Sequence, residues 1–382
     1  FSTHLEDDLK RRDFTINAIA LGTNGEAIDP YEGIKDIIAK TIRTVGSPED
    51  RFNEDGLRIM RSVRLFTELG FTIEENTATA IKKTAHLLEN IAKERIRDEF
   101  VKIISSNVPA HGIQTAHDLQ ILKYIVPELE EGIGIDQNQA HAFDVWTHLL
   151  KTLQHAAEKG WPLHIRLAAL FHDVGKPRTR RKDSTKGDWT FYGHEVVGAR
   201  MTEKIMRDLR FSKELSEQVV RLVRWHMFFS DTEQITLSAV RRLISKVGQE
   251  NVWDLMNIRI CDRIGTGRPK ENPYRLRKYK SMVEEVMRDP VSVGMLAIDG
   301  GGVMETAQIP AGPKIGHILH ALLEEVLENP SLNTKEYLQK KAVELASLSK
   351  QSLKEMGEHG REKKEAEDKK DIEAIRGRYH VE

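Results

Sequence analysis

Apolar positions recur every three or four residues along most of this chain, which is the spacing of one face of an α-helix. The repeat predicts successive helices over residues 54–69, 75–88, 92–105 and 109–122. Later apolar runs predict further helices around residue 148, before residues 172 and 226, up to about residue 288 and over 317–327. We therefore expect a mainly α-helical protein.

A short β-hairpin near the start of the chain is the exception. Thr15–Leu21 is predicted as an apolar strand, and Asn24-Gly25 follows it in a turn before the chain returns. Asn-Gly between apolar runs favours a two-stranded hairpin. After the hairpin, Ile34–Ala39 predicts a short helix, and Ser47-Pro48-Glu49-Asp50 is a typical helix start.

Composition narrows the class of protein. Charged residues make up 31% of the 382 residues, and no apolar run approaches the length of a membrane span. The single cysteine, Cys261, excludes a disulfide framework and predicts a buried thiol in a reducing compartment. We expect a cytoplasmic protein without a membrane partner. Because Phe1 leads directly into a dense polar motif, we also expect natural sequence upstream of it.

Two clusters of basic residues, at 178–186 and 268–280, contrast with a formal net charge of −1. Such patches can follow a phosphate backbone even on a neutral protein. Charge alone favours two solvated loops about equally.

Histidine and aspartate residues with metal-ligand character follow several of the predicted helices. An apolar run ends in the adjacent pair His172 and Asp173, just before Gly175 and Pro177. One such residue alone is usually structural, but a set in this order predicts a divalent metal site. The predicted ligands are His148, His172, Asp173, His194, His226 and Asp262.

A metal held by imidazoles and carboxylates lowers the pKa of bound water and promotes attack on phosphorus. Asp173 is placed to bridge two metals or to orient that water, and Lys176 to meet a substrate phosphate. We therefore predict His172, Asp173 and Lys176 as catalytic residues. These ligand types suit Mn²⁺ or Ni²⁺, among other divalent metals.

A charged stripe runs along the predicted helix 54–69. Asp55, Arg58, Arg61 and Arg64 recur every third residue. Taken alone, such a ladder is typical of a solvated helix face with ion pairs.

Four motifs, at 10–18, 28–33, 54–58 and 94–99, resemble in their order the motif series of class II tRNA nucleotidyltransferases. These are the bacterial CCA-adding enzymes, close relatives of bacterial poly(A) polymerases. The His-Asp region resembles the HD phosphohydrolase domain that is fused to some of them. His148, His172, Asp173 and Asp262 match the four-ligand core of that domain. His194 and His226 then suggest a second metal or contacts to substrate phosphate.

The resemblance assigns roles to the stripe and to the first motif. Asp55 and Arg58 would pair with the edges of cytosine and adenine in place of a nucleic-acid template. The other nucleotide-binding residues would be Arg12 on the incoming nucleotide, Asp13 and Asn17 at the ribose and local turn, and Arg61 and Arg64 on the triphosphate. The implied partners are tRNA, CTP and ATP, and the implied transferase cofactor is Mg²⁺.

The family's metal-binding Asp-x-Asp pair and glycine-rich turn do not appear before Arg11. We therefore expect an amino-terminally truncated chain that binds nucleotide better than it transfers it. The predicted function is the addition of CMP and AMP to tRNA 3′ ends, with hydrolysis of phosphate esters or 2′,3′-cyclic phosphates in the HD domain. Alternatives are an RNA- or nucleotide-binding HD phosphohydrolase without transferase activity, and a poly(A) polymerase.

The resemblance also implies a domain order. It comprises a remnant of the nucleotidyltransferase head with a residual β-hairpin (1–45), a helical nucleotide-reading neck and body (46–130), an all-α HD domain (131–288), a helical carboxyl-terminal module (289–346) and a charged tail (347–382). The glycine-rich run 298–316 is predicted as a turn and helix start. The oligomeric state stays open, as does the choice between CC, A and CCA addition.

Overall fold

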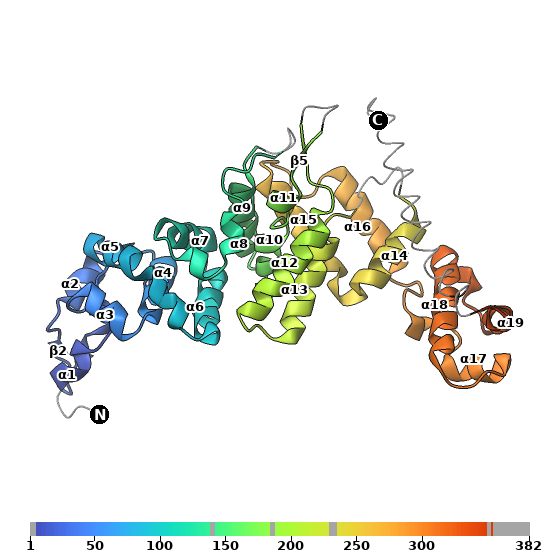
Figure 1. The fold of residues 1–382 in the computed structure, drawn as a ribbon, viewed down its shortest axis with the longest axis horizontal. Coiled ribbons are helices and arrows are strands. Elements are labelled where there is room, and N and C mark those ends of the chain that lie inside the picture. Colours follow the sequence, from blue (N-terminus) through green and yellow to red (C-terminus); the bar gives the residue numbers. More distant parts are fainter. Residues whose placement is uncertain (1–4, 138–141, 184–187, 229–234, 350–352, 354–382) are drawn as a thin grey trace. The chain divides into compact units, whose positions relative to one another are not determined.

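The computed structural model of the protein describes residues 5–137, 142–183, 188–228, 235–349 and 353, and helices dominate it (Figure 1). The chain divides into two units. The first comprises Phe1–Lys182, Asp188–Met227 and Asp254–Glu271, and the second comprises Asp183–Gly187, Phe228–Trp253 and Asn272–Glu382. The mainly α-helical prediction is confirmed. No helix in the described ranges is long and apolar enough to cross a membrane.

The helices of the first unit are α1 (Leu5–Lys10), α2 (Gly33–Ile38), α3 (Pro48–Glu54), α4 (Leu57–Leu69), α5 (Glu75–Thr84), α6 (Lys93–Ser105), α7 (Pro109–Asp118), α8 (Pro127–Glu130), α9 (Val145–Glu158), α10 (Leu163–Phe171), α11 (Lys176–Thr179), α12 (His194–Asp208), α13 (Lys213–Trp225) and the part of α15 (Val252–Gly265) that follows Trp253. They lie in the predicted order, except that α1, α8 and α11 were not predicted. Short 3₁₀ helices lie at Thr15–Asn17, Ala85–Asn90 and Leu122–Tyr124. Cys261 in α15 is buried, as predicted, and burial raises the pKa of its thiol.

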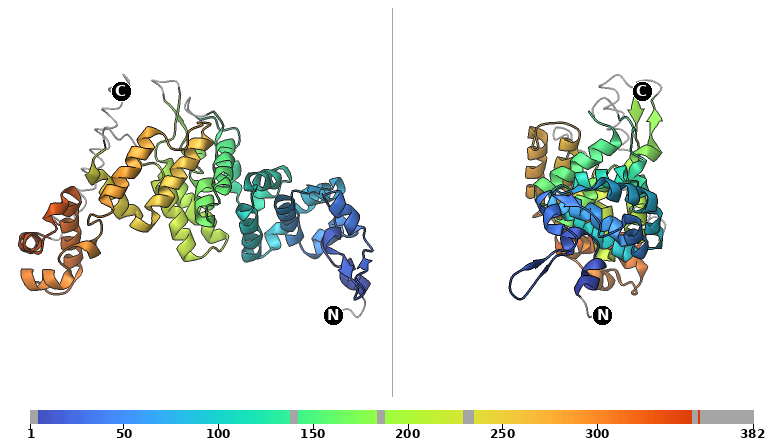
Figure 2. Two further views of the ribbon diagram at one scale, coloured as in Figure 1. Left: turned by 180° about the vertical axis from the view of Figure 1, so that it is seen from behind. Right: turned by 90° about the vertical axis from the view of Figure 1, so that its left-hand side faces the viewer.

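The predicted hairpin forms, but it is shorter than the sequence pattern suggests. β1 (Ala20–Leu21) pairs antiparallel with β2 (Ala27–Ile28), and the hairpin projects from the helices (Figure 2). Thr15–Asn17 is a 3₁₀ helix instead of a strand, because the Asp13 carboxylate accepts hydrogen bonds from Phe14 N and Asn17 Nδ2 and turns the chain there.

A parallel strand pair was not predicted. β3 (Thr41–Ile42) pairs with β4 (Thr72–Ile73), in register Thr41 to Thr72, and so joins the predicted head segment to the predicted neck. Strands of two residues are too short to show an alternating pattern, so the sequence carried no signal for them.

The predicted helix 54–69 is wrong at its start. α3 ends at Glu54, Asp55 is extended (φ −151°, ψ 103°), and α4 begins at Leu57. The Asp55 carboxylate accepts a hydrogen bond from Leu57 N at 3.1 Å and so satisfies a backbone donor at the start of the new helix. Asp55 therefore lies at a break between helices, and only the three arginines of the predicted stripe lie on α4.

Two arginines join the body to the helices that follow. Arg166 in α10 donates hydrogen bonds to the carbonyls of Ile104 (3.0 Å) and Ser106 (2.7 Å) at the end of α6. Arg97 in α6 donates to the carbonyl of Arg210 at the end of α12. Each guanidinium satisfies carbonyls that a helix end leaves without intrahelical partners. These hydrogen bonds hold α6, α10 and α12 together.

The second unit has its own core. Its elements are α14 (Leu237–Val247), α16 (Tyr274–Val286), α17 (Gly300–Ala307), α18 (Pro313–Glu328), α19 (Lys335–Ala346) and 3₁₀ helices at Gln249–Asn251, Val293–Met295 and Pro330–Leu332. Val303, Ile318, Leu322 and Leu338 are fully buried between α17, α18 and α19. The run 298–316 forms a turn and helix starts, as predicted. Most of the predicted charged tail, 347–382, lies outside the described residues.

Candidate metal centre and nucleotide face

The structure brings together the six residues that the sequence predicts as metal ligands. They come from α9, from the residues that follow α10 and α13, from the first residue of α12, and from α15. All six side chains are buried. Their ligand atoms form two groups that share one carboxylate: His148, His172, Asp173 and Asp262, and Asp173, His194 and His226.

Two glycines allow the helices that carry these ligands to approach closely. A Cβ atom on Gly265 would lie 2.2 Å from Thr152 Oγ1 and 3.0 Å from His148 Nδ1. A Cβ atom on Gly175 would lie 2.3 Å from the carbonyl oxygen of His194. Side chains at these positions would push α15 away from α9, and the start of α12 away from the turn after α10.

In the first group, four side chains converge on one point. Nε2 of His148 lies 3.0 Å from Nε2 of His172. Asp173 Oδ2 lies 3.1 Å and 3.2 Å from these two nitrogens, and Asp262 Oδ1 lies 3.5 Å and 3.8 Å from them. The arrangement presents two imidazole nitrogens and two carboxylate oxygens to a common centre.

In the second group, the other oxygen of the shared carboxylate meets two further histidines. Asp173 Oδ1 lies 3.2 Å from Nε2 of His194 and 3.5 Å from Nε2 of His226. These two nitrogens are 3.2 Å apart. Asp173 thus directs one oxygen to each group, which is the geometry of a bridging carboxylate.

Backbone carbonyls orient three of the four imidazoles. In each case Nδ1 donates to a carbonyl three residues earlier in the chain: His172 to Ala169 (2.9 Å), His194 to Phe191 (2.8 Å) and His226 to Val223 (2.7 Å). A carbonyl only accepts, so the proton of a neutral ring is on Nδ1 and the Nε2 lone pair faces the centre. Carbonyls that fix ligand tautomers in this way are typical neighbours of metal-binding histidines.

The donor set fits divalent metal. Ligand atoms about 2.1 Å from one metal lie about 3.0–3.4 Å from each other in octahedral and tetrahedral geometry. The shortest separations here are 3.0–3.2 Å. Lone pairs that face one another at such distances repel, and a cation between them removes the repulsion. The helices α9–α15 therefore carry buried clusters suited to divalent metal ions.

The same crowding shifts the pKa values of the ligands. Burial raises the pKa of the Asp173 carboxyl, but the charges of His172 and Lys176 outweigh it and hold that pKa well below its usual range. Burial lowers the pKa of His172, yet Asp173 and Asp262 raise it to about 9. For His226, the effect of Asp173 does not outweigh burial, which lowers the pKa of the ring to about 4. At neutral pH the carboxylates stay ionised, whereas His172 without metal is protonated. Metal that binds at Nε2 of His172 therefore displaces a proton from the ring.

Polar neighbours surround the centre. Nζ of Lys176, predicted as catalytic, lies 2.5 Å from Asp173 Oδ2 and donates to Gln137 Oε1 at 2.6 Å. Arg259 donates to Asp262 Oδ2 at 2.7 Å, so one oxygen of that carboxylate is held while the other faces the histidines. Neither Gln137 nor Arg259 was predicted. Gln137 carries no local signal in the sequence, whereas the position of Arg259 one turn before Asp262 could have indicated it.

Part of the predicted nucleotide-binding set also lies together. Asp13 accepts from Asn17 Nδ2 at 3.0 Å and pairs with Arg61 at 2.6 Å. Burial raises the pKa of the Asp13 carboxyl, but Asn17 and Arg61 together lower it below its usual value.

Arginines of α3 and α4 donate hydrogen bonds to the backbone of the first motif. Arg58 donates to the carbonyl of Arg11 at 2.8 Å, and Arg51 donates to the carbonyl of Lys10 at 3.0 Å. The motif loop is therefore fixed on these two helices.

Asp55 has both carboxylate oxygens engaged. Oδ1 accepts from Leu57 N, and Oδ2 lies 2.8 Å from Nη2 of Arg95 in α6. Arg12 pairs with Asp8 at 2.9 Å, and about half of the Arg12 side chain is exposed (52%). Forty residues separate Asp55 from Arg95, and no sequence signal linked them.

Arg64 lies apart from that group and is tied to acidic side chains. Its guanidinium lies 2.7 Å from Glu99 and 2.9 Å from Glu68, and only 15% of the side chain is exposed. The triphosphate contact predicted for Arg64 stays a prediction.

Comparison with known proteins gives this geometry a context. Residues 1–43 match the family model of the poly A polymerase head domain, and residues 70–133 match that of the probable RNA and SrmB-binding site of polymerase A. Residues 145–264 match the HD domain. An A-adding tRNA nucleotidyltransferase of Deinococcus radiodurans is 34% identical over 84% of this chain and 75% of its own length.

The chain belongs to the family of bacterial CCA-adding tRNA nucleotidyltransferases. A CC-adding enzyme of Thermus thermophilus is 35% identical, over 87% of this chain and 75% of the relative. The crystal structure of the Bacillus stearothermophilus CCA-adding enzyme in complex with CTP superposes with a TM-score of 0.65 at 25% identity, over 90% of this chain and 75% of that one.

Membership of the CCA-adding family confirms the resemblance inferred from the four motifs, and with it an enzyme of tRNA processing that carries an HD domain. The chain spans three quarters of the length of the A-adding and of the CC-adding relative. The roles of single residues stay predictions, as do the domain limits. The second unit takes in Phe228–Trp253, which lies inside the predicted HD segment 131–288.

Proposed function

We propose that this CCA-adding family member adds CMP and AMP from CTP and ATP to tRNA 3′ ends in the cytoplasm. We also infer that its HD domain hydrolyses phosphate esters or 2′,3′-cyclic phosphates. Mg²⁺ serves the transferase, and a transition metal such as Mn²⁺ or Ni²⁺ serves the HD domain. The observation that carries the hydrolase is the pair of buried ligand groups that share Asp173.

Bound at these groups, divalent metal would supply Lewis-acid activation of water and of the phosphate. The chain's own residues do the rest. The four histidines and Asp262 fix the positions of the metal, and Asp173 spans both groups. Lys176 carries a positive charge beside Asp173 and is placed to meet a phosphate oxygen. Hydrolysis of a 2′,3′-cyclic phosphate consumes one water: a bond forms from the water oxygen to phosphorus, one ribose oxygen leaves, and it takes up a proton.

For the transferase, we propose that Asp55 and Arg58 read the base, that Arg12 and Arg61 contact the incoming nucleotide and its triphosphate, and that Asp13 and Asn17 hold the ribose and the turn. The contacts support this assignment, because Asp55 is oriented by two partners and Asp13 joins Asn17 to Arg61. Arg64 adds a further triphosphate contact in this proposal.

The hydrolase is tested with the full chain and 2′,3′-cyclic AMP in Mn²⁺ or Ni²⁺. The double variant His172→Ala, Asp173→Ala should lose bound metal by elemental analysis and lose hydrolysis, while CTP binding persists. The matched control is His164→Gln, because His164 lies on α10, which His172 and Asp173 directly follow, but pairs with Asp254 (2.8 Å) outside the ligand groups. Full metal content in the double variant would contradict the proposal.

The transferase is tested by incorporation of labelled CTP and ATP into tRNA that lacks its 3′ end, with the complete natural protein. Asp55→Ala should remove the preference for CTP and ATP over UTP and GTP in a competition assay. Unchanged preference would exclude the template role. Hydrolysis without incorporation would favour the alternative of a nucleotide-binding HD phosphohydrolase. Repeated addition of AMP, beyond one residue per RNA and without CMP, would favour a poly(A) polymerase.

A further inference from the structure

A two-stranded hairpin begins and ends at the metal centre. β5 (Arg181–Lys182) follows α11, whose first residue is Lys176, and β6 (Trp189–Thr190) leads through Phe191 to His194 (Figure 1). Phe191 contacts both sides, since its carbonyl orients His194 and its ring centroid lies 5.7 Å from Lys176 Nζ. The base of the hairpin therefore adjoins the place where a scissile phosphate would bind.

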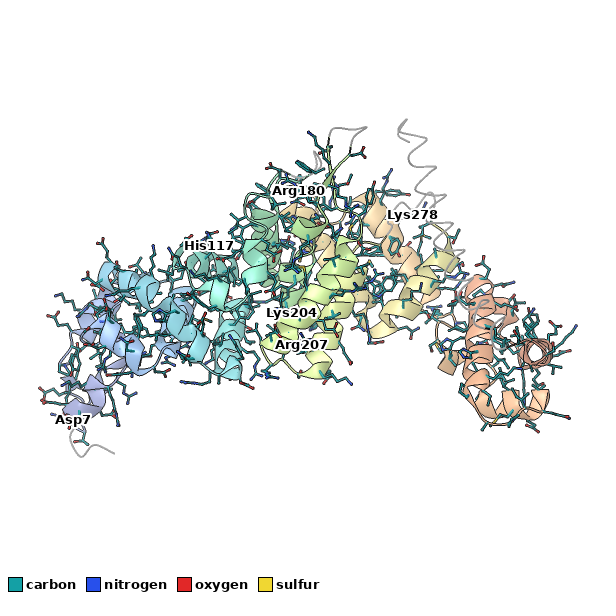
Figure 3. The ribbon with its side chains drawn as sticks, viewed as in Figure 1. Asp7, His117, Arg180, Lys204, Arg207 and Lys278 are labelled. Atoms are coloured by element: carbon teal, nitrogen blue, oxygen red, sulfur yellow. The ribbon has the colours of Figure 1, made fainter. Side chains whose placement is uncertain are left out.

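An arginine and a tryptophan stack at this base. Cζ of Arg180, marked in Figure 3, lies 3.7 Å from the ring centroid of Trp189. An arginine stacked on an indole keeps the N–H edge of its guanidinium available for an anion.

The guanidinium of Arg180 is poorly satisfied by the protein. Among the described residues, its ion-pair partner is Asp136 at 3.7 Å, and the Asp136 side chain is 81% exposed. Nε of Arg180 is buried without a hydrogen-bond partner in the described part of the chain. The Arg180 guanidinium is partly buried, stacks on an aromatic ring and has N–H donors that the described residues do not use. Such a group is suited to bind a phosphate ligand.

The position suits the nucleotide next to the reacting end. Arg180 follows Lys176 by one helical turn, so their Cα atoms lie within the ~14 Å that four extended residues would span. A free nucleotide with its phosphate at the centre ends there, whereas an RNA strand continues past it. Arg181 and Lys182 are exposed and extend the positive charge along β5.

We propose that Arg180 and Trp189 bind the penultimate nucleotide of an RNA 3′ end, with the phosphodiester on the guanidinium and the base stacking against the indole. The preferred substrate of the HD centre is then a polynucleotide that ends in a phosphate or 2′,3′-cyclic phosphate. This assignment rests on the proposed hydrolase. Arg180 touches no reacting atom and acts as a substrate-binding residue.

The test compares two substrates of the metal-loaded full chain: free 2′,3′-cyclic AMP and the tetranucleotide ACCA ending in a 2′,3′-cyclic phosphate. Arg180→Gln should lower kcat/KM for the tetranucleotide about tenfold, chiefly through KM, because a charged hydrogen bond to phosphate is lost. Hydrolysis of free cyclic AMP should not change. The slope of log KM against log salt for the tetranucleotide should fall by about 0.7, the value for one phosphate contact on a single strand.

Arg178→Gln is the matched control. It removes the same charge two residues earlier, but Arg178 is committed to Glu131 through contacts of 2.8 Å and 2.6 Å. Its kinetics should equal those of the wild type on both substrates. The proposal is overturned if Arg180→Gln leaves the tetranucleotide unaffected, if it lowers hydrolysis of both substrates equally, or if Arg178→Gln has the same effect.

A binding measurement separates this proposal from the hydrolase itself. If the wild type hydrolyses neither substrate, the hydrolase fails, and anisotropy of a fluorescent 3′-phosphorylated ACCA then tests the hairpin alone. Binding about tenfold weaker in Arg180→Gln than in the wild type and Arg178→Gln would support the site. Equal binding by all three proteins would overturn it.

Discussion

The metal centre and the predicted nucleotide face, which is the first motif together with Arg51, Asp55, Arg58 and Arg61, are built in opposite ways. The centre gathers buried imidazoles and carboxylates from distant elements, and most of its histidines are oriented by a backbone carbonyl. The nucleotide face uses long arginines of α3 and α4, partly exposed, that hold a neighbouring backbone loop or pair with carboxylates. In the first arrangement, imidazole nitrogens and carboxylate oxygens face a common centre, whereas in the second the arginines already have carbonyl or carboxylate partners.

Removal of metal should therefore separate the two regions most sharply. A ligand that binds only the folded state at about 1,000 times its Kd stabilises that state by about 4 kcal/mol. Treatment with EDTA should lower the melting temperature measured by scanning fluorimetry, and Mn²⁺ should restore it. Binding of fluorescent CTP without added metal should stay the same. A parallel loss of CTP binding would show that the two regions depend on each other.

A buried ion pair between Arg64 of α4 and Glu99 of α6, apart from the nucleotide face, should give the next largest effect. Arg64→Met leaves Glu99, which is 4% exposed, with less compensation, and breaking such a buried pair costs about 3 kcal/mol. Urea unfolding should show the loss. The control is Lys83→Met, whose partner Glu49 is exposed, and it should change stability by less than about 1 kcal/mol. Equal effects would mean that burial does not set the strength of these pairs.

Close packing at the metal centre can be tested by a substitution that adds one methyl group. Gly265→Ala would place a Cβ atom 2.2 Å from Thr152 Oγ1 and 3.0 Å from His148 Nδ1. Overpacking of this kind costs about 1–3 kcal/mol, and the displacement of His148 should also weaken Mn²⁺ binding in calorimetry. Gly294→Ala is the control, because no atom of the described residues lies within 4 Å of its Cβ position. Unchanged metal affinity in Gly265→Ala would show that α15 can shift without moving the ligands.

The smallest effect should come from the titration of Asp13. Its pKa is lowered in the folded state, so its ionised form stabilises the fold above the pKa of the unfolded chain. That contribution is lost as the pH falls through the folded pKa. The melting temperature of Asp13→Asn should therefore lie below that of the wild type at pH 7, and the gap should narrow towards pH 3. A gap that does not change with pH would point to a loss of shape, not of charge.

The sequence predicted which residue types form the metal centre better than it predicted which side chains contact one another. His148, His172, Asp173, His194, His226 and Asp262 were found because few other combinations of residue types in helical segments bind metal. Their division into two groups around Asp173 depends on how α9, α10, α12, α13 and α15 pack, which no local pattern encodes. Asp55 shows the same limit, because its spacing from Arg58 fits a helix that a side-chain hydrogen bond to Leu57 interrupts.

The hydrogen bonds from Arg166 and Arg97 between the body and the HD helices decide whether the HD segment can be separated from the rest of the chain. Arg166 is 8% exposed, and its guanidinium is satisfied by carbonyls that include Ile104 and Ser106, outside the HD segment. A gene fusion that carried the HD segment alone would leave the guanidinium of Arg166 without those two acceptors. The HD segment therefore depends on the end of α6 and is not an independent module in evolution. A lineage that detached it would have to exchange Arg166 for an apolar residue or recruit a new helix end to replace that of α6.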